Sequence, residues 1–175
     1  RGLEDAEISL QSQAVCDRLV RSPWYMASRT IGVFLSMPKG ELRTDAILRH
    51  AFAQGKKVYC PRVMGEGWME MMEVGSAEEA LQLPLSKWKI PEPPVESPQV
   101  DPVDLDLILV PAVALDLSRR RCGHGKGFYD RYIARARAGG RSRAVGVGLV
   151  EQRDDEVPLE SHDELLDAVI FPDAE

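Results

Sequence analysis

The sequence predicts a Rossmann-like α/β fold, in which helices cover both faces of a mostly parallel sheet in three layers. Short apolar runs rich in β-branched residues alternate along the chain with stretches of helical periodicity. The most apolar of these runs are typical of strands that are buried on both faces of a parallel sheet. The 175 residues, of which 44% are hydrophobic, suit one domain spanning residues 1–175 with a sizeable core.

The first half of the chain is predicted to alternate between helices and strands. Ile8, Val15 and Leu19 share one face of the first helix. Thr44 is expected to cap the second helix, and an S-x-x-E capping box at Ser76 begins the third. The predicted order is a helix at 8–21, a strand at Thr30–Met37, a helix between Thr44 and Gly55, strands at Lys57–Val63 and Trp68–Val74, and a short helix from Ser76.

The second half supplies the remaining elements. Residues 90–104 carry many prolines without periodicity, and we interpret them as a surface loop in preference to a hinge between two lobes. The clearest buried strand of the chain is Leu105–Pro111. It is followed by a helix at 128–138, closed by two glycines, and by strands at Arg143–Val150 and Asp167–Phe171.

The stretch RRRCGHGKGFYDRY, residues 119–132, is the most unusual part of the chain, with glycine at every second position from 123 to 127. It lies between a buried strand and a helix, at the edge where open α/β sheets bind ligands. The glycines let a ligand approach main-chain N–H groups, and the following helix directs its positive end to the same place. Arg121 and Lys126 add full charges, so the stretch predicts an anion site, with phosphate as the foremost ligand. The alternative is a glycine-rich turn that only joins a strand to a helix.

Known phosphate-binding motifs do not match this stretch. A P-loop requires Ser or Thr after the lysine, where Gly127 stands, and the dinucleotide motif requires glycine at Phe128. Asp130 lies in the first turn of the predicted helix, where its negative charge interacts favourably with the helix dipole. Beside a phosphate it also suits Mg²⁺, which prefers one or two carboxylates together with phosphate oxygens. The acidic segment at 151–167 offers a second carboxylate at Asp163, although such a run is more often a solvated surface.

Bulk composition limits the possible functions. The net charge of −6 argues against a general nucleic-acid or membrane-surface role, and no apolar run approaches the roughly 20 residues of a membrane span. Cys16, Cys60 and Cys122 are far apart and have no metal-type spacing with the three histidines. We therefore expect free thiols in a reducing compartment, the cytoplasm in the first place and an organelle as the alternative.

Several short motifs, taken in order, resemble those of the 5-formyltetrahydrofolate cyclo-ligase (methenyltetrahydrofolate synthetase) family over nearly the whole chain. The family signature R-x-G-x-G-x-G-[YF]-Y-D is matched by Arg121 through Asp130. The other matches are FLSM at Phe34–Met37, E-x-x-T at Glu41–Thr44, PR at Pro61 and Arg62, the W-x-I-P-x-P stretch from Trp88, the P-x-x-x-x-D strand end at Pro111 and Asp116, and HD at His162 and Asp163. The resemblance implies the α/β fold that sugar-phosphate isomerases and CoA-transferases share.

The resemblance also implies an activity. The family cyclises 5-formyltetrahydrofolate to 5,10-methenyltetrahydrofolate, converts ATP to ADP and phosphate, uses Mg²⁺, and passes through a phosphorylated formyl group. It further suggests a monomer whose partners are small molecules, which agrees with the expectation from the net charge that neither nucleic acid nor membranes bind. The family's basic N-terminal helix, whose Lys and Arg side chains contact ATP phosphates, is expected to lie mostly before the first residue given.

Site roles follow from the resemblance, position by position. Arg121 and Lys126 would be catalytic, and Mg²⁺ would bind at Asp130 and Asp163. The implied ATP-binding residues are Arg121, Cys122, Gly123, His124, Gly125, Lys126, Gly127, Phe128 and Tyr129. The implied folate-binding residues are Leu35, Glu41, Trp88, His124, Gly125, Lys126, Gly127 and Phe128.

The chain departs from the family pattern in a few places, and two other functions compete. Arg119 stands where the family usually has Gly, Cys122 stands where it often has Leu, and one residue is inserted between Met37 and Glu41. One alternative is a non-catalytic member of the same fold that binds folate or a nucleotide. The other is a sugar-phosphate isomerase or CoA-transferase-like enzyme, which would require a catalytic base at a strand end and no GKGFYD stretch.

Overall fold

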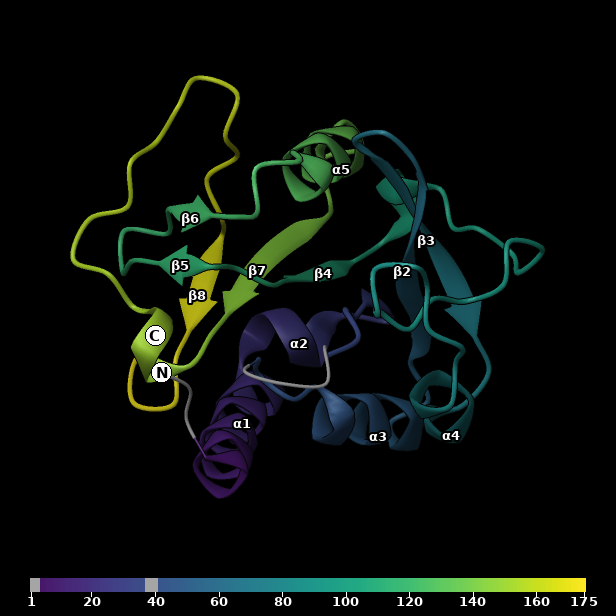
Figure 1. Ribbon diagram of the computed structural model, residues 1–175, viewed down its shortest axis with the longest axis horizontal. Coiled ribbons are helices and arrows are strands. Elements are labelled where there is room, and N and C mark those ends of the chain that lie inside the picture. Colours follow the sequence, from purple (N-terminus) through teal and green to yellow (C-terminus); the bar gives the residue numbers. More distant parts are fainter. Residues whose placement is uncertain (1–3, 37–40) are drawn as a thin grey trace.

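The computed structural model describes residues 4–36 and 41–175, and a six-stranded sheet forms its centre (Figure 1). The strands of this sheet are β1 (Thr30–Gly32), β2 (Lys57–Gly65), β3 (Trp68–Val74), β4 (Leu107–Val110), β7 (Arg143–Val147) and β8 (Ala168–Ile170). Their order is β3-β2-β1-β4-β7-β8. β2 and β3 form an antiparallel hairpin, and all other neighbours are parallel. The predicted mostly parallel α/β sheet is therefore confirmed.

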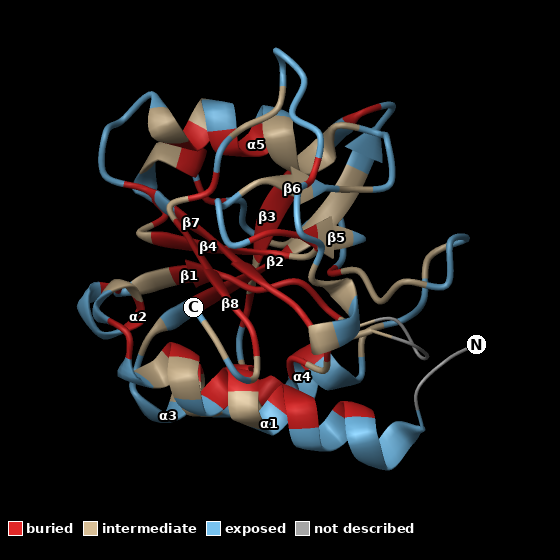
Figure 2. Cartoon of the chain, turned by 90° about the vertical axis from the view of Figure 1, so that its left-hand side faces the viewer, coloured by how far each residue is buried: buried red, intermediate tan, exposed pale blue. Residues whose placement is uncertain are grey.

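Helices cover both faces of the sheet and complete three layers (Figure 2). The helices of one face are α1 (Asp5–Arg21), α2 (Pro23–Ala27), α3 (Asp45–Ala53) and α4 (Ala77–Leu81). The other face carries α5 (Phe128–Arg137). Two short 3₁₀ helices, η1 (Pro102–Asp104) and η2 (Val150–Gln152), lie in connections between these elements.

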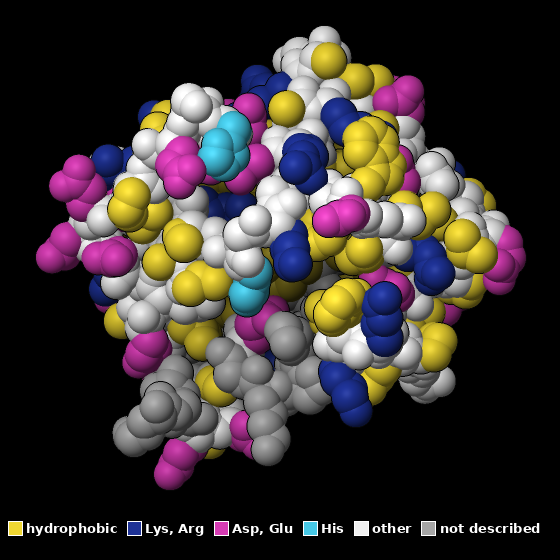
Figure 3. Space-filling view, turned by 45° about the horizontal axis from the view of Figure 1, so that its top comes forward, with side chains coloured by type: hydrophobic (Ala, Val, Ile, Leu, Met, Phe, Trp, Pro, Cys, Tyr) yellow, Lys and Arg dark blue, Asp and Glu magenta, His cyan; other side chains and the backbone are white. Residues whose placement is uncertain are grey.

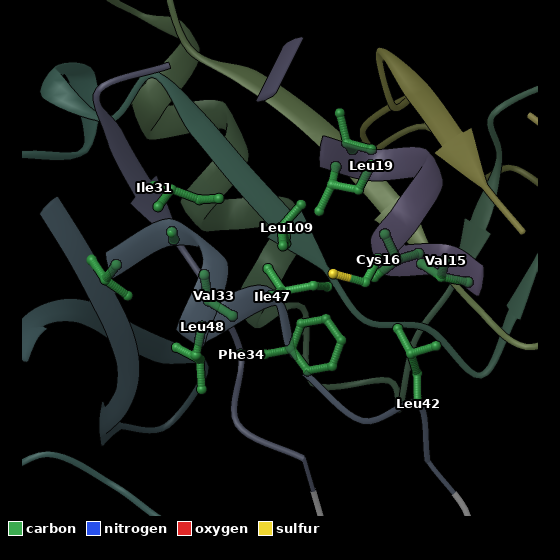
Figure 4. Close-up of a cluster of buried hydrophobic side chains, with 14 of the residues drawn as sticks. Val15, Cys16, Leu19, Ile31, Val33, Phe34, Leu42, Ile47, Leu48 and Leu109 are labelled. Carbon is green, nitrogen blue, oxygen red and sulfur yellow. The ribbon is translucent and has the colours of Figure 1, made fainter. Parts of the chain in front are cut away.

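Two hydrophobic cores fill the spaces between the sheet and its helices. In β4, Leu107 and Leu109 belong to the core against α1 and α3, whereas Ile108 and Val110 belong to the core against α5. Successive strand residues face opposite sides of a sheet, so one buried strand contributes to both cores. Figure 4 shows Leu109 among the side chains of the first core. All four residues of β4 are buried, as its apolar sequence predicts.

The segment after β1 leaves the sheet earlier than the sequence predicts. β1 ends at Gly32, although the apolar run predicts a strand as far as Met37, a residue outside the described range. Side-chain bonds replace the ladder here, because Ser36 Oγ accepts the Thr44 N–H at 2.9 Å. The Thr44 hydroxyl donates to the Phe34 carbonyl at 2.8 Å, so Thr44 stands at the N-cap of α3 without the expected side-chain cap.

Two further boundaries refine the predictions. Ser76 Oγ accepts the Glu79 N–H at 3.0 Å and caps α4, whereas the Glu79 carboxylate accepts the Gly75 N–H instead of closing the box on Ser76. β7 ends at Val147 rather than Val150, because the chain turns into η2 there.

The proline-rich segment at 90–104 lies along the outer edge of β3. The Pro98 carbonyl accepts the Glu73 N–H at 2.8 Å, and the Val100 N–H donates to the Met71 carbonyl at 3.1 Å. Its interpretation as a surface loop agrees with this packing.

A small hairpin, which the sequence does not predict, comes directly before the candidate functional site. β5 (Ala114–Leu115) and β6 (Arg121–Cys122) pair antiparallel between β4 and α5. The Asp116 carboxylate is fully buried and accepts the N–H groups of Arg120 at 3.0 Å and Val157 at 2.8 Å. These bonds fix the hairpin turn against the C-terminal segment, and β6 then leads directly into the glycine stretch.

Candidate functional site

The glycine stretch leads into the N-terminus of α5, as the sequence predicts, but it starts from β6 and not from the buried strand β4 (Figure 1). Gly127 is the N-cap residue of α5 and has φ +73°, while Gly125 has φ +87°. Only glycine adopts this left-handed region readily, so the two glycines set the path of the chain into the helix. No side chain of the N-cap residue satisfies the first N–H groups of α5, and this favours an anion at the helix start.

Arg121 places a fixed positive charge at the base of this loop. Its Nε donates to the Pro111 carbonyl at 2.6 Å, and its guanidinium carbon lies 5.3 Å from the centre of the Tyr129 ring. A Cβ on Gly123 would lie 2.7 Å from Arg121 Nη2, so a larger residue there would displace the guanidinium. Burial lowers the pKa of the Arg121 guanidinium, while the charge of Asp130 and weaker contributions from other groups raise it. An arginine stays protonated under such opposing effects.

The three consecutive arginines have different roles. Arg120 Nε pairs with Asp116 Oδ2 at 2.8 Å and supports the hairpin turn. Arg119 has φ +71°, and its carbonyl accepts the Leu166 N–H at 3.0 Å. Arg121, in contrast, places its guanidinium beside Gly123 at the start of the glycine stretch.

Lys126 and His124 are exposed on the loop. Within the described part of the chain, neither side chain forms a hydrogen bond or ion pair with the protein. Cys122 is also exposed, whereas Phe128 and Tyr129 are half-buried and pack against the core under α5. The loop thus offers one anchored cation and one cation that is free to follow a ligand.

The two predicted metal carboxylates lie near each other. Asp130 Oδ1 accepts the main-chain N–H of Glu164 at 3.0 Å, which places Asp130 one residue from Asp163 along the neighbouring segment. Asp163 Oδ2 accepts the Glu160 N–H at 2.9 Å. Burial lowers the pKa of Arg121, whereas the negative charges of both acids raise it.

These two carboxylates fit a metal ion whose remaining coordination positions are filled by a bound ligand. The described residues contain no group of three or more His, Cys, Asp or Glu side chains that could hold a metal ion alone. Two carboxylates suit Mg²⁺ when phosphate oxygens and water supply the remaining positions. The arrangement therefore favours a metal that enters with a phosphate ligand.

The three expected folate contacts that lie outside the glycine stretch have different surroundings. Leu35 is buried in the core against α1 and α3. Glu41 is half-buried. Burial raises the pKa of Tyr129, the charge of Arg121 lowers it, and the charge of Glu41 adds a smaller rise. Trp88 is 57% exposed in a turn, where Lys87 Nζ lies 5.0 Å from its ring centre. In the described part of the chain no hydrogen bond joins Leu35 or Trp88 to the glycine stretch.

Charged side chains gather on one face of the molecule. Figure 3 shows Lys or Arg, Asp or Glu, and His side chains around a hollow near the middle of this face.

Two other hollows, of about 520 and 300 Å³, lie at the amino ends of the strands, where they include Thr30, Lys57 and Arg143. The C-terminal ends of α2 and α3 border the larger hollow, and helix C-termini disfavour anions. Lys56 Nζ, which also lines it, donates to two main-chain carbonyls. The helix ends at the larger hollow therefore disfavour a phosphate ligand there, and the glycine stretch stays the candidate site.

One residue of the site is not apparent from the sequence. Arg131 Nη1 donates to the Gly67 carbonyl at 2.8 Å and to the Lys126 carbonyl at 3.4 Å. An arginine after the signature reads as an ordinary helix residue, and no local pattern indicates a partner on the distant β2–β3 turn.

Comparison with known proteins supports the family resemblance. Residues 1–172 match the model of the 5-formyltetrahydrofolate cyclo-ligase family. The probable 5-formyltetrahydrofolate cyclo-ligase of Schizosaccharomyces pombe is 37% identical over 98% of this chain and 88% of its own length. The 5-formyltetrahydrofolate cyclo-ligase of Mus musculus is 31% identical over 99% of this chain and 88% of its own length.

Solved structures agree with this result. The 5,10-methenyltetrahydrofolate synthetase of Aquifex aeolicus superposes with a TM-score of 0.78 at 28% identity, covering 98% of this chain and 82% of that one. The synthetase of Mycoplasma pneumoniae gives a TM-score of 0.75 at 21% identity, covering 98% and 90%, and shows the shared fold. The chain therefore belongs to the 5-formyltetrahydrofolate cyclo-ligase family.

Proposed function

We propose that this chain cyclises 5-formyltetrahydrofolate to 5,10-methenyltetrahydrofolate and converts ATP to ADP and phosphate in the same reaction. One observation carries the proposal: the family signature from Arg121 to Asp130 forms a cationic loop at a helix N-terminus that no N-cap side chain satisfies. The match to the family over nearly the whole chain supports the same reaction.

The chemistry needs activation of a poor leaving group. In the proposed reaction the formyl oxygen attacks the γ-phosphorus of ATP, an O–P bond forms, and the bond to ADP breaks. N10 then attacks the activated formyl carbon, and phosphate leaves with the former formyl oxygen as the ring closes. Phosphoryl transfer depends mainly on positioning and charge stabilisation, which the loop is built to supply.

Each charged residue has a distinct proposed role. Arg121 holds phosphate oxygens from a fixed position, and Lys126 stabilises the charge that develops on the transferred group. Asp130 and Asp163 would hold Mg²⁺, which neutralises phosphate charge when bound. The N–H groups of the glycine stretch, from Cys122 to Tyr129, complete the phosphate contacts.

The folate contacts are proposed on the same basis. Glu41 accepts hydrogen bonds from pterin N–H groups, which a carboxylate does strongly. Trp88 offers an exposed ring face, and Leu35 contributes an apolar contact.

Formation of the methenyl product tests the function directly. On mixing the protein with Mg-ATP and 5-formyltetrahydrofolate, we expect the methenyl absorbance band to appear, and to remain absent without ATP. If both ligands bind and no product forms, the non-catalytic alternative replaces the proposal.

We further propose a cytoplasmic monomer, with only small molecules as partners. Among the described residues, no helix has both the length and the apolar character needed to cross a membrane. The relative from Arabidopsis thaliana is named as mitochondrial, so fractionation of cells is the measurement that decides the compartment.

A further inference from the structure

We propose that Arg131 is a positioning residue, which holds the glycine stretch in its phosphate-binding shape by clamping it to the β2–β3 turn. The inference rests on the proposed function, because the stretch that Arg131 holds is the proposed phosphate site.

The side chain of Arg131 joins two segments that are far apart in sequence. Its Nη1 donates to the Gly67 carbonyl at 2.8 Å and, more weakly, to the Lys126 carbonyl at 3.4 Å. Its main-chain N–H donates to the Gly127 carbonyl at 3.1 Å. The main-chain bond is an ordinary i→i−4 bond of α5, so the side chain alone links the glycine stretch, through the Lys126 carbonyl, to the turn between β2 and β3.

Gly67 leaves room for this clamp. Gly67 and Gly127 have φ of +68° and +73°, and both lie against the guanidinium of Arg131. A Cβ on Gly67 would overlap Nη1, whereas a Cβ on Gly127 would lie at an ordinary contact distance of 3.7 Å from the guanidinium carbon. The turn therefore requires glycine at position 67 for the contact to form. Gly65, the last residue of β2, has open space around it and no such requirement.

The clamp sets the direction of a peptide that faces the proposed ligand site. In a planar trans peptide the carbonyl and the N–H point in opposite directions, and the described residues contain no cis peptide. Because Arg131 binds the Lys126 carbonyl, the Gly127 N–H points away from Arg131. Without the clamp this peptide is free to rotate. The Gly127 N–H then loses its fixed direction, and the main-chain position from which the Lys126 side chain extends is no longer fixed.

Arg135 provides the matched contrast on the same helix. Its Nη2 contacts both carboxylate oxygens of Glu70 at 3.0 and 3.1 Å, and its guanidinium carbon lies 4.1 Å from the Trp68 ring centre. These contacts also tie α5 to β3, but none reaches the glycine stretch. Loss of Arg135 therefore reports the general effect of loosening α5.

The test measures methenyl formation with varied ATP at saturating 5-formyltetrahydrofolate, and binding of Mg-ATP alone by calorimetry. Arg131→Met keeps the apolar stem and removes the donors. We expect kcat/KM for ATP to fall by about tenfold to a hundredfold, the scale of a misplaced catalytic group. Arg131→Lys, which restores a cationic donor, should recover part of this loss. Arg135→Met should lower the melting temperature and keep kcat/KM for ATP near the wild-type value.

Variants of the turn test the same contact from its other side. Gly67→Ala should reproduce the loss of Arg131→Met, and the double variant should be no worse than either single one, because both remove one interaction. Gly65→Ala should behave like the wild type. Gly55→Ala has the same left-handed backbone, with φ +75° and open space, and measures the cost of that conformation away from the site.

Wild-type kinetics in Arg131→Met would overturn the inference, and so would fully additive losses in the double variant. If the wild-type chain binds Mg-ATP but forms no product, the proposed function fails, and Mg-ATP binding still tests the role of Arg131. In that case weaker Mg-ATP binding by Arg131→Met supports the clamp, and equal binding overturns it.

Discussion

Arg121 and Lys126 are two cations of one loop that differ in freedom. Arg121 is anchored to the Pro111 carbonyl at 2.6 Å, so its charge stays at the base of the loop. Lys126 is exposed and has no protein partner within the described residues. A flexible ammonium can follow a migrating phosphoryl group, whereas an anchored guanidinium holds a ligand in place.

This difference predicts that Lys126 acts mainly in the transition state. Lys126→Met should lower kcat by about a hundredfold or more at saturating ATP and folate, by analogy with the loss of one oxyanion donor. Lys57→Met, which removes an exposed lysine at the opposite edge of the sheet, is the control. Near-normal kcat in Lys126→Met would reduce this lysine to a docking charge.

Asp130 can be tested for metal binding without disturbing its structural bond. Asn keeps an oxygen that accepts the Glu164 N–H, which Asp130 Oδ1 now accepts at 3.0 Å, but it removes the charge that Mg²⁺ needs. We expect Asp130→Asn to raise the Mg²⁺ concentration for half-maximal activity, while Asp155→Asn, at an exposed position, leaves it unchanged. An unaltered Mg²⁺ dependence in Asp130→Asn would leave Asp130 as a helix-dipole acid.

At the scale of elements, the β5–β6 hairpin depends on one buried carboxylate. Asp116 accepts bonds from Arg120 Nε and from the N–H groups of Arg120 and Val157. Burial raises the pKa of Asp116, but these bonds and the Arg120 charge outweigh it and hold that pKa below its usual value. The hairpin that leads to Arg121 is therefore held by these polar contacts together with Leu115, which is fully buried in the core against α5.

Asp116→Asn should reduce the free energy of unfolding by about 1.5–3 kcal/mol at neutral pH, because a charge-assisted set of bonds is weakened. A carboxylate with a lowered folded-state pKa stabilises the fold above its unfolded pKa of about 4, and this contribution is lost as pH falls through the folded-state pKa. The difference between the variant and the wild type should therefore shrink below about pH 4 in urea denaturation curves.

Glu156→Gln is the control for Asp116→Asn. Glu156 is 77% exposed and 3.5 Å from Arg120 Nη1, so its loss should cost less than about 1 kcal/mol. A stability difference for Asp116→Asn that stays constant into acid would contradict the role of its charge.

At the scale of the whole molecule, the layers were predictable and the contacts between elements were not. β4 is buried along its whole length, and the helices have a clear apolar face, so local periodicity suffices to predict the mostly parallel sheet. The two-residue strands of the hairpin are too short for any periodic signal. The strand order depends on which apolar runs meet in space, and a single run does not encode that.

The candidate site divides in the same way. The spacing from Arg121 to Asp130 reveals the loop, because Gly125 and Gly127 adopt left-handed backbone conformations that a local glycine pattern can indicate. The contact of Arg131 with Gly67 spans 64 residues and has no local signature. The expected roles of Leu35, Glu41 and Trp88 remain predictions, as do the metal ligands.

The two outer strands of the sheet also affect how readily copies of the chain associate through their sheet edges. β3 presents seven residues, but the segment at 98–100 hydrogen-bonds to its main chain, and β8 at the far end has only three residues. Unpaired strand edges are templates on which a second chain can add its own strand and begin to aggregate. With one edge occupied and the other short, the sheet offers little backbone for intermolecular β-pairing.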